Sequence, residues 1–87
     1  MKTYFTTTFK KHYLKRIYSN KSLDHQFEER HELFASNQKD PLLKDHALAG
    51  KMKGFRSFSI TGDIRVVYYI SNNIAYFVDI GSHNQVY

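Results

Sequence analysis

Residues 55–80 read FRSFSITGDIRVVYYISNNIAYFVDI, and this stretch decides the fold. It contains three runs rich in β-branched and aromatic residues, which predict strands at 55–60, 64–70 and 74–80. Thr61-Gly62-Asp63 and Ser71-Asn72-Asn73 separate the runs and are typical of tight turns. Because strands joined by such short turns pair with each other, we expect an antiparallel meander.

Side chains alternate between the two faces of a strand, so the spacing predicts which residues lie together. One face is expected to be apolar and covered by helices; its residues are Phe58, Ile60, Ile64, Val66, Tyr68, Ile70, Ile74, Tyr76, Val78 and Ile80. The opposite face is expected to mix polar groups with aromatic rings; its residues are Ser57, Ser59, Arg65, Val67, Tyr69, Ala75, Phe77 and Asp79. This second face is the one that carries information about function.

The residues before the meander predict a strand and a helical hairpin. Residues 3–8 favour a short first strand, and Phe9, Tyr13 and Ile17 have the spacing of one helical face. The basic residues of this first helix, Lys11, Lys15 and Arg16, are expected mostly on its other face.

The second helix is expected to begin at Ser22, which can cap it, and to end at Asn37, ahead of the Asp40-Pro41 pair. Its apolar stripe is Leu23, Phe27, Arg30 and Phe34, with the Arg30 stem covering apolar surface. Residues 42–53 predict a basic loop or short strand draped over the domain.

Length and composition restrict the class of protein. Eighty-seven residues suffice for one domain with one core, so we expect a single domain spanning 1–87. The absence of cysteine excludes a disulfide framework and a thiolate zinc site and favours the cytoplasm. We find neither a signal-peptide pattern nor an apolar run of membrane-spanning length. The net charge of +5 suits a nucleic acid or an acidic protein as partner, without choosing between them.

Three segments resemble the YafQ-like branch of the RelE/ParE toxin superfamily: Lys44-Asp45-His46-Ala47-Leu48 with Gly50, residues 53–60 with 63–68, and Gly81-Ser82-His83 with Tyr87. The resemblance implies an α+β, RelE-like fold in which an N-terminal strand and a helical hairpin pack on one face of an antiparallel sheet. It also implies a toxin of a type II toxin-antitoxin system that cuts messenger RNA in the ribosomal A site without a metal or other cofactor. The implied partners are a cognate antitoxin, bound in a heteromeric complex, the ribosome and mRNA, with no membrane involved.

Cleavage of RNA without a metal needs a base for the 2′-hydroxyl proton, an acid for the departing 5′-oxygen and cations for the phosphate. The resemblance implies that His46 and His83 transfer the protons, in roles that the sequence leaves open. It assigns Arg65 to the scissile phosphate, Asp63 to orienting a histidine or adjusting its pKa, and Tyr87 to stacking on a codon base. The residues expected to bind RNA are Lys44, Lys51, Lys53, Arg56 and Ser59. His12, His25 and His31 match no motif and are expected to be surface residues.

Each assignment has a plainer alternative. His46 and His83 can be solvated loop residues, Arg65 can pair with Asp79 across the sheet, Asp63 can be an ordinary turn residue, and Tyr87 can be a frayed terminus. The basic residues can be solvated surface charges.

The chain also departs from the YafQ pattern, which has a histidine at the position of Ser59 and often a tryptophan at that of Ile64. Either His46 and His83 suffice, or the activity is reduced. Two further hypotheses therefore stay open: a ParE-like toxin that inhibits DNA gyrase without nuclease activity, and an inactive relative that only binds a partner.

Overall fold

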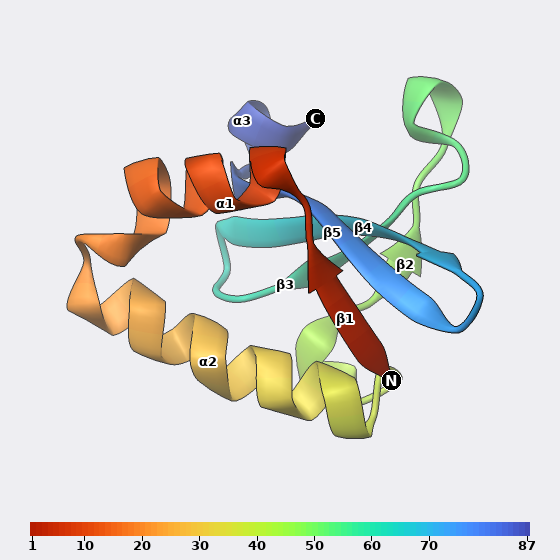
Figure 1. Cartoon of the computed structure of the whole chain (residues 1–87), viewed down its shortest axis with the longest axis horizontal. Coiled ribbons are helices and arrows are strands. Elements are labelled where there is room, and N and C mark those ends of the chain that lie inside the picture. The colour runs from red at the N-terminus through yellow and green to blue at the C-terminus, as the bar shows by residue number, and fades with distance from the viewer.

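A five-stranded sheet in the order β1-β5-β4-β3-β2 is the frame of the computed structural model, which describes residues 1–87 (Figure 1). The strands are β1 (Lys2–Phe5), β2 (His46–Ala47), β3 (Arg56–Ser59), β4 (Ile64–Ser71) and β5 (Ile74–Ser82). β1 runs parallel to β5, and the other neighbours are antiparallel. The predicted meander is therefore confirmed as β3-β4-β5, and β1 makes the complete sheet a mixed one.

The helical hairpin consists of α1 (Thr7–Tyr13), which continues into a π-helical turn, η1 (Leu14–Tyr18), and α2 (Lys21–Ser36). The strand predicted at 3–8 is too long, because the Thr6 hydroxyl accepts a hydrogen bond from the Phe9 amide at 3.2 Å and starts α1 there. Ser22 is not the cap of α2. Asn20 takes that role by accepting from the Leu23 amide at 3.1 Å, while the predicted end at Asn37 is confirmed.

The segment between α2 and the meander is mostly irregular, as predicted. It contains two short 3-10 turns, η2 (Pro41–Leu43) and η3 (Gly50–Met52), with β2 between them. A last helix, α3 (His83–Val86), was not expected from the sequence. No helix combines the length and the apolar character needed to cross a bilayer.

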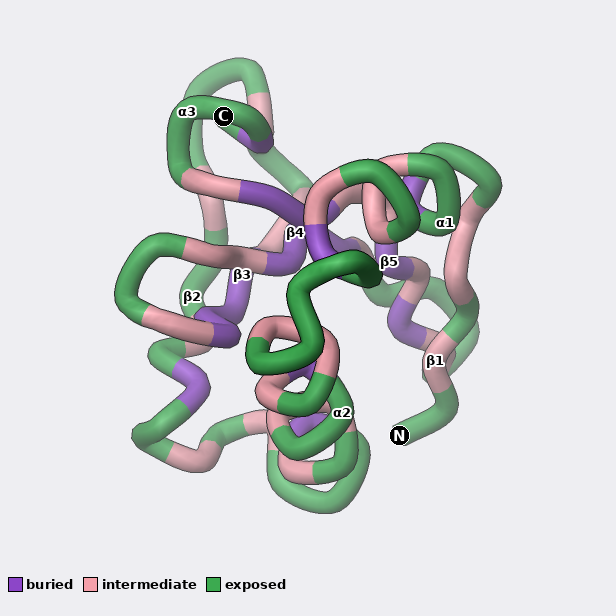
Figure 2. The backbone as a smooth tube through the Cα atoms, turned by 90° about the vertical axis from the view of Figure 1, so that its left-hand side faces the viewer, coloured by how far each residue is buried: buried purple, intermediate pink, exposed green.

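The core lies between the helices and one face of the sheet, and Figure 2 colours its buried residues purple. Aromatic side chains make up much of it. Phe34 of α2 stacks on Phe58 of β3 with ring centroids 4.7 Å apart, and Phe9 of α1 meets Phe77 of β5 edge to face. Burying such rings removes large apolar areas from water and is the main stabilising contribution in a domain of this size.

A β-bulge in β5 corrects the predicted faces. Val67 is opposite Asp79 while Tyr68 is opposite Phe77, so Val78 has no partner and the alternation reverses there. Ala75 and Phe77, predicted on the open face, are fully buried in the core. Ile74 and Tyr76 move instead to the open face, where Tyr76 stacks on Tyr69 at 5.0 Å. The order of the strands β3, β4 and β5 thus follows the prediction. The side chains of residues 74–77, however, point to the opposite face from the one predicted.

Candidate active site

Three of the predicted site residues lie on the open face, which is the face of the sheet opposite the helical hairpin. The cross-strand register places His46 opposite Ser57, which is opposite Val67. In the next row Ser59 is opposite Arg65, and Arg65 is opposite Gly81. Adjacent strands are about 4.8 Å apart and the two rows are two residues apart along the strands, so the backbones of His46 and Arg65 are separated by roughly 12 Å. Side chains of this length can bridge such a gap around a phosphate.

His83 and Tyr87 come from α3, which continues β5 beyond Gly81. Ser82 and Gln85 form a capping box in which the Ser82 amide donates to Gln85 Oε1 at 2.8 Å. The two rings meet edge to face with centroids 4.7 Å apart, and the Tyr87 hydroxyl donates to Ser57 Oγ at 2.5 Å. Val86 of the same helix is buried. The terminus is anchored, so the alternative of a frayed end does not describe Tyr87.

Arg65 has no carboxylate partner. Its Nη1 lies 3.4 Å from Ser59 Oγ, a long contact, and its Nε is buried without any hydrogen-bond acceptor. Asp79, the alternative partner, bonds elsewhere: its Oδ1 lies 2.6 Å from His12 Nδ1 and 3.3 Å from Arg16 Nη1. A buried, unsatisfied donor on a charged group is costly unless an anion completes it. Arg65 therefore carries a positive charge that no acidic side chain of the protein neutralises.

The contacts of Asp79 also correct two expectations about α1. His12 is not a free surface residue, and Arg16 turns toward the sheet, where Nη1 also donates to the Ile80 carbonyl at 3.0 Å. His31 is half-buried as well: its Nε2 is 2.8 Å from Thr3 Oγ1, and burial lowers its pKa from the ordinary value of 6.5. Only His25 of the three is exposed, as predicted.

His46 is exposed and has a defined tautomer. Its Nδ1 lies 2.9 Å from the Lys44 carbonyl, which can only accept, so Nδ1 carries the hydrogen. In the neutral ring, Nε2 is then the atom that carries the lone pair and can accept a proton.

A buried polar network holds the backbone just before His46. Asp45, whose side chain is 5% exposed, accepts from Arg56 Nε at 2.8 Å and Arg56 Nη2 at 2.6 Å. The Tyr68 hydroxyl donates to the other oxygen of Asp45 and accepts from Gln38 at 2.8 Å. The hydrogen bond to Asp45 raises the pKa of Arg56, and burial, with Asp45, raises the pKa of Tyr68. Arg56, expected to bind RNA, is thus already paired within the protein.

The remaining predicted residues are exposed. Asp63 lies in the turn between β3 and β4, where its amide donates to Thr61 Oγ1 at 3.2 Å; its carboxylate bonds to neither His46 nor His83. Lys44, Lys51 and Lys53 are exposed without an ion-pair partner, and Lys44 has a left-handed backbone with φ of 50°. No group of three or more His, Cys, Asp or Glu side chains is close enough to share a metal ion.

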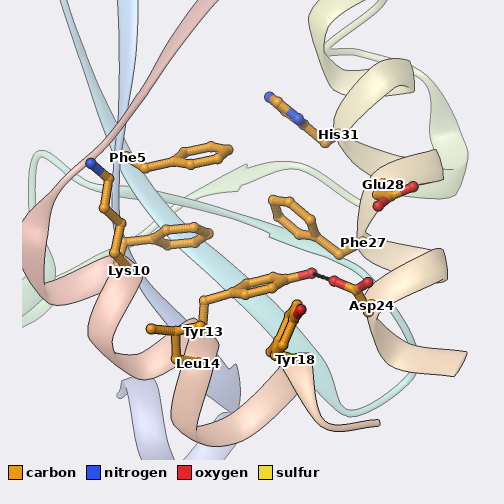
Figure 3. Close-up of a pocket in the computed structure, with 10 residues that line it drawn as sticks. Phe5, Lys10, Tyr13, Leu14, Tyr18, Asp24, Phe27, Glu28 and His31 are labelled. Carbon is orange, nitrogen blue, oxygen red and sulfur yellow. Dashed lines mark hydrogen bonds between the residues drawn. The ribbon is translucent and has the colours of Figure 1, made fainter. Parts of the chain in front are cut away.

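The largest cavity lies away from this face, between the two arms of the helical hairpin (Figure 3). It has a volume of about 550 Å³, and its walls are mainly aromatic, with Phe5, Tyr13 and Phe27 among them. The Tyr13 hydroxyl donates to Asp24, and burial together with this bond raises the pKa of Tyr13. None of the predicted site residues lines it.

The family model described as "Bacterial toxin of type II toxin-antitoxin system, YafQ" matches residues 1–87. YafQ from E. coli strain BL21(DE3) is a similar solved structure: 18% identity, 98% of this chain and 96% of that chain covered, TM-score 0.79. A metal-bound toxin from Helicobacter pylori is 25% identical, with 100% of this chain and 99% of that chain covered and a TM-score of 0.77. In the E. coli DinJ-YafQ toxin-antitoxin complex, the matching chain is 19% identical, with 98% of this chain and 94% of that chain covered and a TM-score of 0.76. No curated protein matches the chain.

Proposed function

The chain belongs to the YafQ family of bacterial toxins of type II toxin-antitoxin systems, and we propose that it is a ribosome-dependent endoribonuclease that cuts messenger RNA by metal-independent acid–base chemistry. The observation that carries this proposal is the unpaired guanidinium of Arg65, on the face that also bears His46. A ParE-like inhibitor of gyrase has no need of a prepared phosphate site beside exposed imidazoles.

The chemical step follows from the tautomer of His46. Its free Nε2 takes the proton of the 2′-hydroxyl, and the resulting oxyanion attacks the adjacent phosphorus. The bond from phosphorus to the 5′-oxygen breaks, and His83, in its protonated form, gives a proton to that oxygen. The products are a 2′,3′-cyclic phosphate and a free 5′-hydroxyl, with one proton moved from His83 to the substrate and one from the substrate to His46. Arg65 stabilises the negative charge on the phosphate oxygens throughout.

Ser59 takes a different role from the histidine found at its position in the family. A hydroxyl is a poor base near neutral pH, and Ser59 is nearly buried beside Arg65. It therefore acts as a positioning residue for the guanidinium. Since a positioned proton-transfer group contributes about 100- to 10,000-fold in rate, the chain works with two histidines and is slower than a relative with three.

Tyr87 stacks on a base of the codon in the A site, because the residue is 40% exposed while its hydroxyl is fixed on Ser57. Lys44, Lys51 and Lys53 contribute positive charge along the RNA backbone, and Asp63 adjusts the protonation of a histidine once the substrate is bound. Arg56 contributes mainly through Asp45, by holding the segment that carries His46.

We also propose that a cognate antitoxin covers the open basic face in a heteromeric complex, since the E. coli relative occurs as a DinJ-YafQ complex. Such a partner supplies the acidic groups that the exposed lysines lack. Ribosomal action implies that the chain works in the cytoplasm.

Primer extension on a reporter message tests the proposal in cells. Brief expression of the chain is expected to stop growth and to produce new 5′ ends inside codons, but not in a matched message without a start codon. Growth arrest without new ends would contradict a nuclease. Inhibition of gyrase supercoiling that survives His83→Ala would identify the ParE-like alternative, and normal growth on strong expression would identify an inactive relative.

A further inference from the structure

A second, smaller cleft opens where β3 turns into β4, and all its charged residues are cationic. It has a volume of about 240 Å³ and is lined by Arg30 of α2, Lys44, Ser59 and Thr61, together with uncharged residues. Four acidic residues neighbour lining residues in the sequence, but none of them lines the cleft: Glu29, Asp40, Asp45 and Asp63. Asp40 accepts from the Leu42 amide at 2.9 Å, and Asp45 is paired with Arg56. The cleft is smaller than a pocket for a drug-sized ligand and suits one small anionic group.

Arg30 has N–H groups that donate to no atom of the protein. Its Nη1 donates to the Leu42 carbonyl at 2.8 Å and lies 3.4 Å from the Ser59 carbonyl, but it forms no ion pair. A guanidinium has five N–H donors, so those on Nε and Nη2 stay free for a ligand. The two backbone contacts fix the plane of the group, which favours two-point binding of a phosphate.

Hydrogen bonds from the backbone also orient the hydroxyl of Thr61. Its Oγ1 accepts from the Asp63 amide at 3.2 Å and the Ile64 amide at 3.0 Å. Both lone pairs are therefore engaged, and the hydroxyl hydrogen is left to donate. Lys44 adds a second positive charge from a backbone held in the left-handed region.

Ser59 joins this cleft to the candidate active site. Its side chain contacts Arg65 at 3.4 Å, and its backbone carbonyl contacts Arg30 at the same distance. Two arginines without carboxylate partners therefore lie on either side of one residue. We propose that the cleft binds a backbone phosphate of the RNA next to the one that Arg65 holds, which rests on the proposed function in that RNA is the substrate.

Salt dependence of RNA binding tests this subsite directly. The probe is a fluorescent single-stranded 2′-O-methyl RNA, which lacks the attacking hydroxyl and cannot be cut, with binding followed by anisotropy between low and moderate KCl. Each phosphate contact to a single strand contributes roughly 0.7 to the slope of log affinity against log salt. Because the cleft holds one phosphate, complete loss of the site lowers the slope by about 0.7. Arg30→Gln and Lys44→Gln are each expected to lower the slope by part or all of this amount, and the double variant by about 0.7 in total.

Three controls keep the result interpretable. Lys21→Gln removes an equal charge at the start of α2 and is expected to keep the wild-type slope. Arg30→Lys keeps the charge and is expected to restore most of the slope, while Lys44→Gln breaks no side-chain bond and is expected to leave the fold intact. Wild-type slopes in Arg30→Gln and Lys44→Gln would overturn the proposal, as would binding of inorganic phosphate at Arg30 with no change in the RNA slope. Cleavage of translated mRNA is measured separately, so the two failures are distinguishable. Wild-type salt slopes with intact cleavage would remove the subsite alone, whereas absence of cleavage would remove the function on which the subsite rests.

Discussion

Arg65 and Ser59 are paired across β4 and β3, with Nη1 3.4 Å from Oγ, and no carboxylate shares the guanidinium. A charged group that is partly buried without a counter-ion lowers the free energy of unfolding unless a ligand of opposite charge binds it. We infer from this cost in stability that Arg65 serves binding or catalysis.

Arg65→Gln is therefore expected to separate activity from stability. The rate of RNA cleavage should fall by about 100-fold or more, as when one charge-stabilising donor is removed. The melting temperature should stay equal or rise, because the uncompensated charge is gone. Cleavage on ribosomes and thermal melts followed by circular dichroism measure the two quantities. A large loss of stability would instead mean that Arg65 serves the fold.

Ser59→His restores the histidine of the family pattern and is expected to raise the rate of cleavage by up to about 100-fold. The open face has Arg65 beside this position, and an imidazole can accept from the guanidinium as the hydroxyl does. Ser59→Ala is the matched control and should not exceed the wild-type rate. An equally slow, folded Ser59→His variant would show that the chain needs no third histidine.

Asp45→Asn is expected to destabilise the chain, because the carboxylate binds Arg56 and Tyr68 in a nearly closed site. Loss of such charge-assisted bonds costs about 1–3 kcal/mol in the free energy of unfolding. Urea denaturation measures it. Asp63→Asn changes the same group at an exposed turn and is expected to stay within about 0.5 kcal/mol of the wild type. Equal effects in the two variants would contradict the role given to Asp45.

His31 predicts a pH dependence of stability. Because burial lowers its pKa in the folded chain, the unfolded chain binds the proton more readily. The free energy of unfolding is then highest above pH 6.5 and falls as the pH drops through that value toward the lower folded pKa. His31→Phe should weaken this dependence, since a ring can still pack against Phe27 and Phe5, whereas the exposed His25→Gln should not. Identical pH profiles for His31→Phe and the wild type would refute the assignment.

The meander was predictable because Gly62, Asn72 and Asn73 mark its turns between runs of strand-forming residues. The bulge at Val78 was not, since nothing in a strand of alternating apolar residues distinguishes a skipped partner; only packing around Phe77 decides it. The helix α3 was predictable in principle from Ser82 and Gln85, which have capping-box spacing. The pairing of His12 with Asp79 joins residues 67 positions apart and depends on how α1 packs against β5, which local patterns do not encode.

The candidate site also has a part that the sequence predicted and a part that it did not. His46, Arg65 and His83 were identified through motif resemblance, and the strand register brings His46 and Arg65 to one face. The engagement of Arg56 by Asp45 and the cationic cleft at Arg30 depend on contacts between distant segments, so neither was visible in the sequence.

The most direct measurement of the central claim is single-turnover cleavage of an mRNA whose codon is held in the A site of purified ribosomes. The wild-type chain is expected to cut within that codon and leave a 2′,3′-cyclic phosphate, while His46→Gln and His83→Gln should each be about 100-fold slower or more. Cutting by both folded variants at the wild-type rate, or no cutting by the wild type, would contradict the account.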